Sequence, residues 1–378
     1  MRSKKNIFEG LSREHLIFKD ERSLYPEFVP DKLFHRDREI EAIALALNPL
    51  LKGKKPHNVF LTGSTGVGKT TVSKYVLAEL TEFSDRVKSL YINCFEFNSR
   101  HAVLSSITNF LGRASPRRGI ATDEIYGSLL EAARKATFSP VIILDEVDQL
   151  FLNSDGQKLL YDLLRIVEFE NKVFGIVLIS NNEGLMMSLD ERIKSSLAEE
   201  KIMFEPYSPS ELKDILSERA ELAFLPSVLD AEVIPFVAAR CAKLGGDCRV
   251  GIEALLKGGR VAEKANAKSV QLSHVKNAFE SVEGVSLLKG VKYLSAPEKT
   301  LLSFLAQNPQ LMSGKLFELF SKSSKQMLSE RRIRDILNGL EKKGFVVSEQ
   351  VSMGNQGKTR SFKCRLPSGL LSKELGKI

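Results

Sequence analysis

The sequence Gly63-Ser-Thr-Gly-Val-Gly-Lys-Thr70 decides the fold class of this chain. It follows the apolar run 58–61 and precedes a helical pattern, so both its residues and its position in the chain match a phosphate-binding P-loop. The glycines let the backbone curl so that successive N–H groups and a helix N-terminus face phosphate groups. Lys69 adds a charge for the β and γ phosphates, and the Thr70 hydroxyl is a ligand for Mg²⁺. The predicted phosphate-binding set is Gly63, Ser64, Thr65, Gly66, Val67, Gly68, Lys69, Thr70 and Thr71.

Short apolar runs alternate with helical patterns on both sides of this loop, which is typical of a parallel sheet flanked by helices. Each run is almost entirely apolar, as expected for strands covered on both faces. The predicted strands are 58–61, 88–93, 141–144, 173–179 and 201–204. The sequence therefore predicts an α/β nucleotide-binding domain over residues 1–206.

Two acidic residues end the predicted strand 141–144. We expect Asp145 to bind Mg²⁺ and Glu146 to activate a water molecule, because carboxylates at the C-terminal edge of a parallel sheet lie beside the phosphate site. Asp148 is expected at the surface or at a helix cap. The next strand ends in Asn181, whose polar side chain is predicted to sense the γ phosphate between the acids and the P-loop.

Two changes of pattern divide the rest of the chain. From Tyr207 the patterns are only helical, beginning with the capping box Ser208-Pro-Ser-Glu211, and they predict a lid domain over 207–289. Its further helices are expected over 231–243, 249–265 and 274–282, with a break at 245–247. Three more helices and a hairpin predict a winged helix over 290–378.

The basic charge of the chain is concentrated in that last region. The formal charge is +8 overall, and residues 290–378 hold 16 Lys and Arg against 7 Asp and Glu. In the third helix of the region, an apolar stripe is predicted to leave Arg331, Arg334 and Asn338 exposed on another face. These side chains are candidates for base contacts, and Lys358 and Arg360 of the hairpin are candidates for phosphate contacts.

Composition excludes several other classes of protein. The four cysteines form neither a disulfide framework nor a zinc pattern, which favours a reducing, intracellular setting. The basic N-terminus is not followed by an apolar stretch, so no secretory signal is expected. No run approaches the ~20 apolar residues that a membrane span requires. We therefore expect a cytoplasmic, nucleoid-associated protein without a membrane partner.

With these residues identified, the chain resembles the archaeal origin-recognition and cell-division-cycle initiator family, a branch of the AAA+ ATPases. The resemblance covers nearly the full length. Besides the P-loop and the basic hairpin, it rests on the segments 29–40, 145–150, 160–165, 192–197 and 246–249. It implies ATP or ADP with Mg²⁺ as cofactors, and slow ATP hydrolysis that acts as a switch. It also implies origin DNA, a replicative helicase and paralogous initiator subunits as partners.

The resemblance assigns further residues. Val29, Pro30 and Arg36 match the family's segment around the adenine, and Tyr207 is placed with them at the cofactor. Arg192, on a short helix before the last strand, matches the finger that AAA+ proteins present to a neighbouring subunit's nucleotide. Arg249, at the start of a lid helix, is expected to reach the γ phosphate and couple the lid to nucleotide state.

A second DNA contact is implied in the AAA+ domain. Arg117 and Arg118 match that region of the family, although a solvated loop would have the same composition. Two departures from the family pattern are Asn182, where an acidic residue is usual, and a wing with fewer arginines and glycines. The hairpin nevertheless remains basic.

Three other classes share parts of this pattern. Signalling ATPases combine a P-loop, a lid and a winged helix but append long sensor repeats, and clamp-loader subunits end in a helical collar. A transcription regulator on the same scaffold would look identical in sequence. The prediction is a replication initiator that binds origin DNA and helps to recruit or load the helicase.

Overall fold

The structure is a computed structural model that describes residues 17–116, 119, 121–152, 155–169, 173–197, 199–278, 290–291, 294–308, 310–323, 328–352, 358–366 and 371. The described chain forms two compact units. One holds Glu27–Ile215 and Gly246–Cys248, and the other holds the residues up to Pro26, Leu216–Gly245 and the chain from Arg249 onward. Arg117 and Arg118 lie outside the described residues.

A five-stranded parallel sheet forms the centre of the first unit, in the order β2-β3-β4-β1-β5. Its strands are β1 (Asn58–Gly63), β2 (Val87–Asn93), β3 (Ser139–Asp145), β4 (Gly175–Ser180) and β5 (Glu199–Phe204). All five predicted strands are present, although β4 begins at Gly175 rather than at 173. The predicted α/β class is confirmed.

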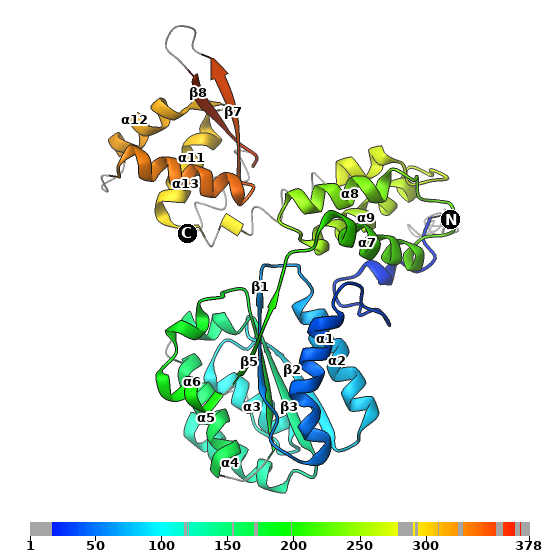
Figure 1. The fold of residues 1–378 in the computed structure, drawn as a ribbon, viewed down its shortest axis with the longest axis vertical. Helices are drawn as coiled ribbons and strands as arrows, with labels where there is room; N and C mark the ends of the chain where they lie inside the picture. The colour runs from blue at the N-terminus through cyan, green and yellow to red at the C-terminus, as the bar shows by residue number, and fades with distance from the viewer. Residues whose placement is uncertain are drawn as a thin grey trace, which may run out of the picture. The chain divides into compact units, whose positions relative to one another are not determined.

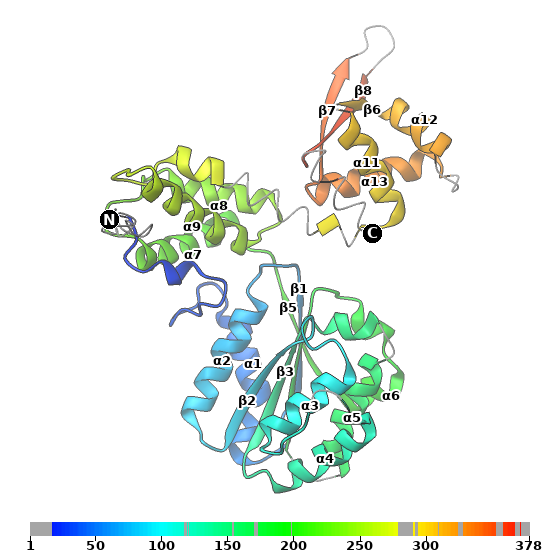
Figure 2. The same ribbon diagram turned by 180° about the vertical axis from the view of Figure 1, so that it is seen from behind.

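Helices cover both faces of this sheet (Figure 1 and Figure 2). On one face lie α1 (Asp37–Leu47) and α2 (Lys69–Phe83), and on the other lie α3 (Arg100–Phe110), α4 (Thr122–Lys135), α5 (Asp155–Phe169) and α6 (Glu191–Leu197). Because side chains alternate along a strand, Val59 and Leu61 pack toward α1 and α2 while Phe60 packs on the opposite face. Burial on both faces explains the apolar sequence of β1, β3 and β4. The expectation that every strand is buried on both faces is wrong for β2 and β5, which lie at the edges of the sheet and are partly exposed.

The lid helices begin where the sequence predicted a capping box. Ser208 N donates to Glu211 Oε2 at 2.7 Å, and Glu211 N donates back to Ser208 Oγ at 3.3 Å, at the start of α7 (Pro209–Ala223). Next come α8 (Val233–Lys243), α9 (Cys248–Lys264) and a helix over 272–278. The predicted continuation of that last helix to 282 lies outside the described residues.

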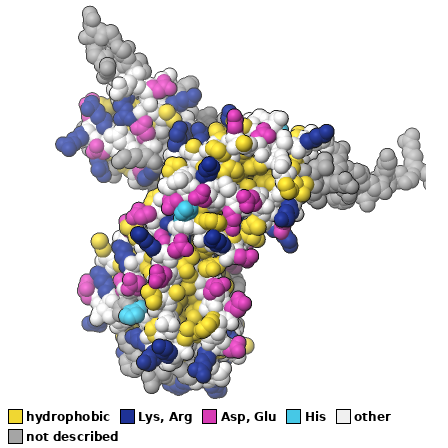
Figure 3. Space-filling model, turned by 45° about the vertical axis from the view of Figure 1, so that its right-hand side comes forward, with side chains coloured by type: hydrophobic (Ala, Val, Ile, Leu, Met, Phe, Trp, Pro, Cys, Tyr) yellow, Lys and Arg dark blue, Asp and Glu magenta, His cyan; other side chains and the backbone are white. Residues whose placement is uncertain are grey.

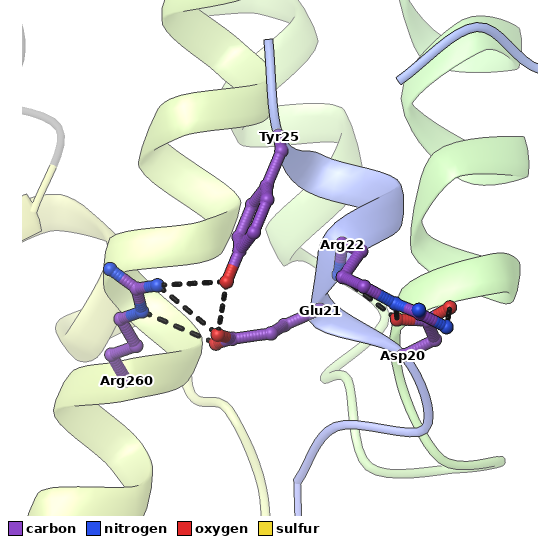
Figure 4. Close-up of polar contacts among 5 residues, drawn as sticks. All are labelled: Asp20, Glu21, Arg22, Tyr25 and Arg260. Atoms are coloured by element: carbon purple, nitrogen blue, oxygen red, sulfur yellow. Dashed lines mark hydrogen bonds and ion pairs between the residues drawn. The ribbon is translucent and has the colours of Figure 1, made fainter. Parts of the chain in front are cut away.

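The N-terminal segment packs on the lid helices rather than on the sheet. Phe18 stacks on Phe224 with ring centroids 4.9 Å apart. Figure 4 shows Arg260 of α9 reaching Glu21 and Tyr25, with Arg260 Nη2 3.2 Å from Glu21 Oε1 and Tyr25 OH donating to the same oxygen at 2.5 Å. Residues up to Pro26 therefore belong to the unit that contains most of the lid.

The C-terminal region has a core and a sheet of its own. Its elements are α11 (Ala296–Gln307), β6 (Leu311–Met312), α12 (Ser313–Ser323), α13 (Glu330–Lys342), β7 (Val346–Ser352) and β8 (Lys358–Cys364), with the antiparallel order β6-β8-β7. Leu301, Phe320, Leu337 and Phe362 are buried together. Three helices and a hairpin confirm the predicted winged helix, and β6 is an addition to it.

Polar and apolar side chains are mixed on the surface. Figure 3 shows one face, on which hydrophobic patches are interspersed with basic and acidic side chains. None of the described helices combines the length and the apolar character that crossing a membrane would require.

Candidate nucleotide and nucleic-acid sites

The P-loop connects β1 to α2 in a conformation that its glycines make possible. Gly66 and Gly68 have φ of 81° and 94°, in the left-handed region that L side chains rarely adopt. A Cβ on Gly66 would lie 1.8 Å from Asp247 Oδ1, and one on Gly68 would lie 2.7 Å from the Tyr207 hydroxyl. The glycines are therefore required both for the curl of the loop and for the close approach of two side chains.

Lys69 is the buried cation at the centre of the loop. Its side chain lies at the first turn of α2, and the residue is only 6% exposed. Its Nζ donates to Gly63 O at 2.8 Å, to Ser64 O at 2.7 Å and to Asn181 Oδ1 at 2.9 Å. The structure thus brings the predicted sensor asparagine, at the end of β4, onto the predicted phosphate-binding lysine.

The predicted magnesium ligands also lie together. Thr70 Oγ1 donates to Asp145 Oδ2 at 2.7 Å, which joins the start of α2 to the end of β3. Asp145 is buried, and a hydroxyl next to a buried carboxylate at the mouth of a P-loop is an oxygen donor set that Mg²⁺ prefers. The residues therefore fit the cofactor that the sequence predicted.

Glu146 follows Asp145 in an unusual backbone conformation. Its φ is 53°, uncommon for a residue other than glycine, and its N–H donates to Asp145 Oδ1 at 2.8 Å. The left-handed turn ends β3 and leaves the Glu146 side chain half-buried. Backbone of this kind is concentrated at functional sites, and the role of Glu146 in activating water stays a prediction.

Tyr91 is a site residue that the sequence reading missed. Its hydroxyl donates to Asp145 Oδ2 at 2.7 Å, the same oxygen that accepts from Thr70. Burial, followed by the charge of Asp145, raises the pKa of Tyr91 far above its ordinary value, so the phenol remains a donor. Tyr91 sits in β2, and only the pairing of β2 with β3 reveals its role.

Asp148 and Asp247 also have partners that the sequence did not indicate. Asp148 is half-buried and accepts a hydrogen bond from Ser180 Oγ at 2.9 Å, so it supports the end of β4 rather than capping a helix. Asp247 lies against Gly66, and the neighbouring Cys248 N donates to Gly66 O at 3.3 Å. The break between the lid helices is thus in contact with the P-loop.

Arg36 is buried beside the P-loop, where the resemblance placed the adenine side of the site. Its Nε donates to Val67 O at 3.2 Å, its Nη2 donates to Glu205 O at 2.7 Å, and its Nη1 pairs with Glu39 Oε1 at 2.9 Å. Its guanidinium also lies 3.9 Å from the centre of the Tyr207 ring. Arg36 therefore ties α1, the P-loop and the end of β5 together.

The remaining predicted nucleotide-site residues fall into three groups. Val29 is half-buried and Pro30 is buried, in the segment that leads to α1. Arg192 is exposed in the first turn of α6, where Asp190 Oδ1 accepts from its backbone N–H at 2.9 Å. Arg249 lies in the first turn of α9, in the other compact unit. Of the P-loop residues, Ser64 and Thr65 are exposed, Val67 is buried and Thr71 is half-buried.

The third helix of the winged helix has the predicted exposed face. Ile333, Leu337 and Leu340 are buried, whereas Arg331, Arg334 and Asn338 are exposed. Arg334 Nη2 lies 3.3 Å from Glu330 Oε2, one helical turn away. The amphipathic pattern of the helix is confirmed.

Arg360, the candidate phosphate contact of the hairpin, has three hydrogen-bond partners within the winged helix. Its guanidinium donates to Asn338 Oδ1 at 2.7 Å, to Glu341 Oε2 at 2.6 Å and to Ser348 Oγ at 2.6 Å. Its role in DNA binding stays a prediction. Lys358 begins β8, and its side chain lies outside the described residues.

Comparisons with known proteins identify relatives over nearly the whole chain. Residues 53–185 match the AAA domain family and residues 213–280 match the Cdc6 AAA+ ATPase-type lid domain. The chain is 36% identical to the ORC1-type DNA replication protein 1 of Archaeoglobus fulgidus, over 98% of this chain and 93% of that protein. It is also 36% identical to the ORC1-type DNA replication protein of Pyrococcus abyssi, over 94% and 89%.

Solved structures show the same similarity in three dimensions. The Aeropyrum pernix ORC1 protein in complex with DNA has a TM-score of 0.72 and 33% identity, and the comparison covers 97% of this chain and 98% of that one. The Aeropyrum pernix ORC2 protein, solved as ADPNP-ADP complexes, has a TM-score of 0.73 at 23% identity over 96% and 98%, which supports the fold.

Proposed function

The chain belongs to the ORC1-type DNA replication proteins, and on that premise we propose that ATP binding and slow ATP hydrolysis control how tightly it binds origin DNA and whether it loads the replicative helicase. It is a DNA replication initiator with an AAA+ ATPase domain. The similarity extends through the winged helix, which favours this function over a signalling ATPase or a clamp-loader subunit.

One observation carries the proposal for ATP. Lys69, Thr70, Asp145 and Asn181 converge at the carboxyl edge of the sheet through hydrogen bonds of 2.7 to 2.9 Å. Bound ATP with Mg²⁺ supplies the phosphoryl group that water attacks. In this proposal Lys69 exchanges its present acceptors for phosphate oxygens, and Thr70 and Asp145 hold the metal.

The other polar groups of the site have roles in hydrolysis. Glu146 is the general base, placed beside Asp145 by the left-handed turn after β3. Asn181 is the sensor, because its side chain already contacts the lysine that must respond to the γ phosphate. Arg192, exposed on α6, is available to a neighbouring subunit's nucleotide.

The chain itself connects the nucleotide site to the lid. Gly246–Cys248 belong to the unit that contains the P-loop, and Asp247 and Cys248 touch Gly66. Arg249 is the next residue, and α9 continues from it. We propose that a change in the P-loop on nucleotide exchange moves the start of α9 and so alters the lid.

The nucleotide half of this proposal is tested by two substitutions. Lys69→Ala should lose most nucleotide affinity, because it removes the cation of the loop. Glu146→Gln should retain binding but stop hydrolysis, measured as single-turnover phosphate release. Hydrolysis at the parental rate by Glu146→Gln would remove Glu146 from the role of base.

The DNA half rests on the basic C-terminal region and its exposed helix face. Residues 290–378 carry a balance of +9, and the winged helix has its own buried core. DNA binding should therefore depend steeply on salt, because each phosphate contact contributes roughly −0.9 to the log-log slope. A chain that ends near Lys289 should bind duplex DNA much more weakly and with a flatter slope. Undiminished affinity and slope would show that the winged helix does not hold the DNA.

A further inference from the structure

The side chain of Asn338 is held in one orientation by its neighbour on the hairpin. Asn338 is exposed on α13, and Arg360 Nη1 of β8 donates to its oxygen at 2.7 Å. Because arginine has donors but no acceptor, the atom that faces Arg360 must be the carbonyl oxygen Oδ1. The amide nitrogen Nδ2 is thereby directed away from Arg360. Among the described residues, none accepts a hydrogen bond from Nδ2.

Arg360 is itself fixed by three further contacts. Its Nη2 donates to Glu341 Oε2 and to Ser348 Oγ, each at 2.6 Å, and its guanidinium lies 5.1 Å from the centre of the Phe362 ring. Glu341 Oε1 in turn accepts from Ser348 Oγ at 2.6 Å. The side chain is therefore anchored between β7, β8 and α13 on the face that carries Asn338.

This network also offsets the charge that Arg360 would offer to a phosphate. The guanidinium is paired with the Glu341 carboxylate, and only 39% of the Arg360 side chain is exposed. Burial works to raise the pKa of Glu341, but Ser348 and the charge of Arg360 hold that pKa below its ordinary value, so the carboxylate stays ionised. The pair as a whole carries no net charge, so it contributes little to counterion release at a phosphate.

We propose that Arg360 is a positioning residue that makes Asn338 a hydrogen-bond donor to the DNA major groove, with guanine as the preferred base. The inference rests on the proposed function, since it requires α13 to lie in that groove. An asparagine that reads adenine uses its oxygen to accept from N6 and its nitrogen to donate to N7. In this protein the oxygen faces Arg360, which leaves the N–H groups for the base edge.

Guanine is the base that fits such a donor. It presents two acceptors, N7 and O6, in the major groove. Adenine presents one acceptor beside a donor, thymine presents one acceptor beside a methyl group, and cytosine presents a donor. The hydrogen bond from Arg360 to the carbonyl oxygen also polarises the amide, which strengthens its N–H groups as donors. A good base contact is worth a discrimination of about 5- to 150-fold.

The test uses the full-length protein and a panel of duplexes. Starting from the preferred duplex found by selection from randomised DNA, every position is replaced by each base pair and the affinity is measured at fixed salt. The unsubstituted protein should prefer guanine over cytosine by about 5- to 150-fold at one position. Asn338→Ala should remove that preference and leave the others intact.

Substitution of Arg360 separates positioning from charge. Arg360→Ala should weaken the guanine preference at the same position and raise the relative affinity for adenine, since the freed amide can turn. The double variant Arg360→Ala with Asn338→Ala should lose no more of that preference than Asn338→Ala alone, as expected for two residues that act as a unit. Asn338→Asp keeps an acceptor for Arg360 but removes the N–H groups, so it should fold and lose the guanine preference.

Lys363 provides the matched control, because it is an exposed cation on the same strand. Lys363→Ala should weaken binding to all duplexes alike and flatten the salt slope by about 0.9 if it meets a phosphate, with base preferences unchanged. The proposal is overturned if Arg360→Ala behaves in that way. It is also overturned if Asn338→Ala and Asn338→Asp retain every base preference. Failure of the proposed function would give a different result. In that case, removal of the whole winged helix would leave DNA affinity and salt slope unaltered.

Discussion

Replacing the buried Arg36 by methionine should destabilise the nucleotide-binding unit even when no nucleotide is present. The Arg36 side chain is 6% exposed and pairs with Glu39, which is 15% exposed. Methionine has a similar length but cannot donate to Val67 O, to Glu205 O or to Glu39. The substitution therefore leaves a carboxylate and two carbonyl oxygens without this donor.

The size of the effect follows from those groups. Removing one partner of a buried ion pair costs about 3 to 5 kcal/mol. Glu39 lies in the first turn of α1, where the helix dipole stabilises a negative charge, so the lower end of that range applies. If Glu39 is changed to glutamine as well, no charge is left unpaired. The remaining loss, at the lower end of about 1 to 3 kcal/mol for each of the two carbonyls, is about 2 kcal/mol.

The assay is urea unfolding followed by far-ultraviolet circular dichroism, since the chain contains no tryptophan. We expect the free energy of unfolding to fall by about 3 kcal/mol in Arg36→Met and to recover in part in Arg36→Met with Glu39→Gln. Arg38→Met is the matched control, because Arg38 is an exposed arginine of the same helix, and it should change stability by less than about 0.5 kcal/mol. ADP affinity should fall in Arg36→Met, because Val67 belongs to the P-loop.

Two results would refute this reasoning. If Arg36→Met is as stable as the parent protein but binds ADP poorly, the guanidinium acts on the nucleotide itself rather than on the fold. The second result concerns the variant that carries both Arg36→Met and Glu39→Gln. If its loss of unfolding free energy equals the sum of the losses in the two single variants, the two side chains are not coupled.

Four further outcomes follow from the geometry. Tyr91→Phe should lower the melting temperature of the nucleotide-free protein, and less so with Mg²⁺ and ATP, because a metal then satisfies Asp145; equal losses in both thermal scans would contradict this. Gly66→Ala should abolish ADP binding in calorimetry, since alanine at a φ of 81° is strained by about 1 to 2 kcal/mol and meets a neighbouring side chain. Arg249→Ala should bind nucleotide yet show the same lid protection in hydrogen exchange with ATP and ADP; a parental difference would make Arg249 an ordinary surface residue. The folded-state pKa of Glu341 is lowered from 4.5, so its contribution to winged-helix stability should be complete above pH 4.5 and lost as the pH falls below it. An unchanged acid transition in Glu341→Gln would rule that contribution out.

The nucleotide site was predictable because its determinants are local. The P-loop is fixed by glycine spacing between an apolar run and a helical pattern, and Asp145 was identified because it ends a buried strand. The sequence predicted only that Asn181 lies near the P-loop, at a neighbouring strand end. It did not predict the hydrogen bond between Asn181 and Lys69. The bond between Tyr91 and Asp145 was not predictable, because it depends on β2 lying beside β3 in one register.

The partners of the buried arginine show a second limit. Arg36 was assigned to the adenine side by resemblance, but its main acceptors, Val67 O and Glu205 O, are backbone atoms. Backbone carbonyls carry no signal in residue type, so no sequence pattern could have named them. The same holds for the winged helix. The helical periodicity predicted that Asn338 is exposed, but it could not predict the hydrogen bond that Asn338 accepts from Arg360 of the hairpin.

The structure gives the glycines at 245–246 a role that the sequence did not indicate. In the sequence they mark a break between two lid helices, and a break requires only flexibility. In the structure a Cβ on Gly246 would lie 3.0 Å from both the N and the O of Tyr207, and the next residue, Asp247, lies against Gly66 of the P-loop. The segment is therefore a close-packed contact with the nucleotide site that continues without interruption into α9. The residues that precede the first turn of α9 are therefore packed against the P-loop itself, which the helical break in the sequence did not indicate.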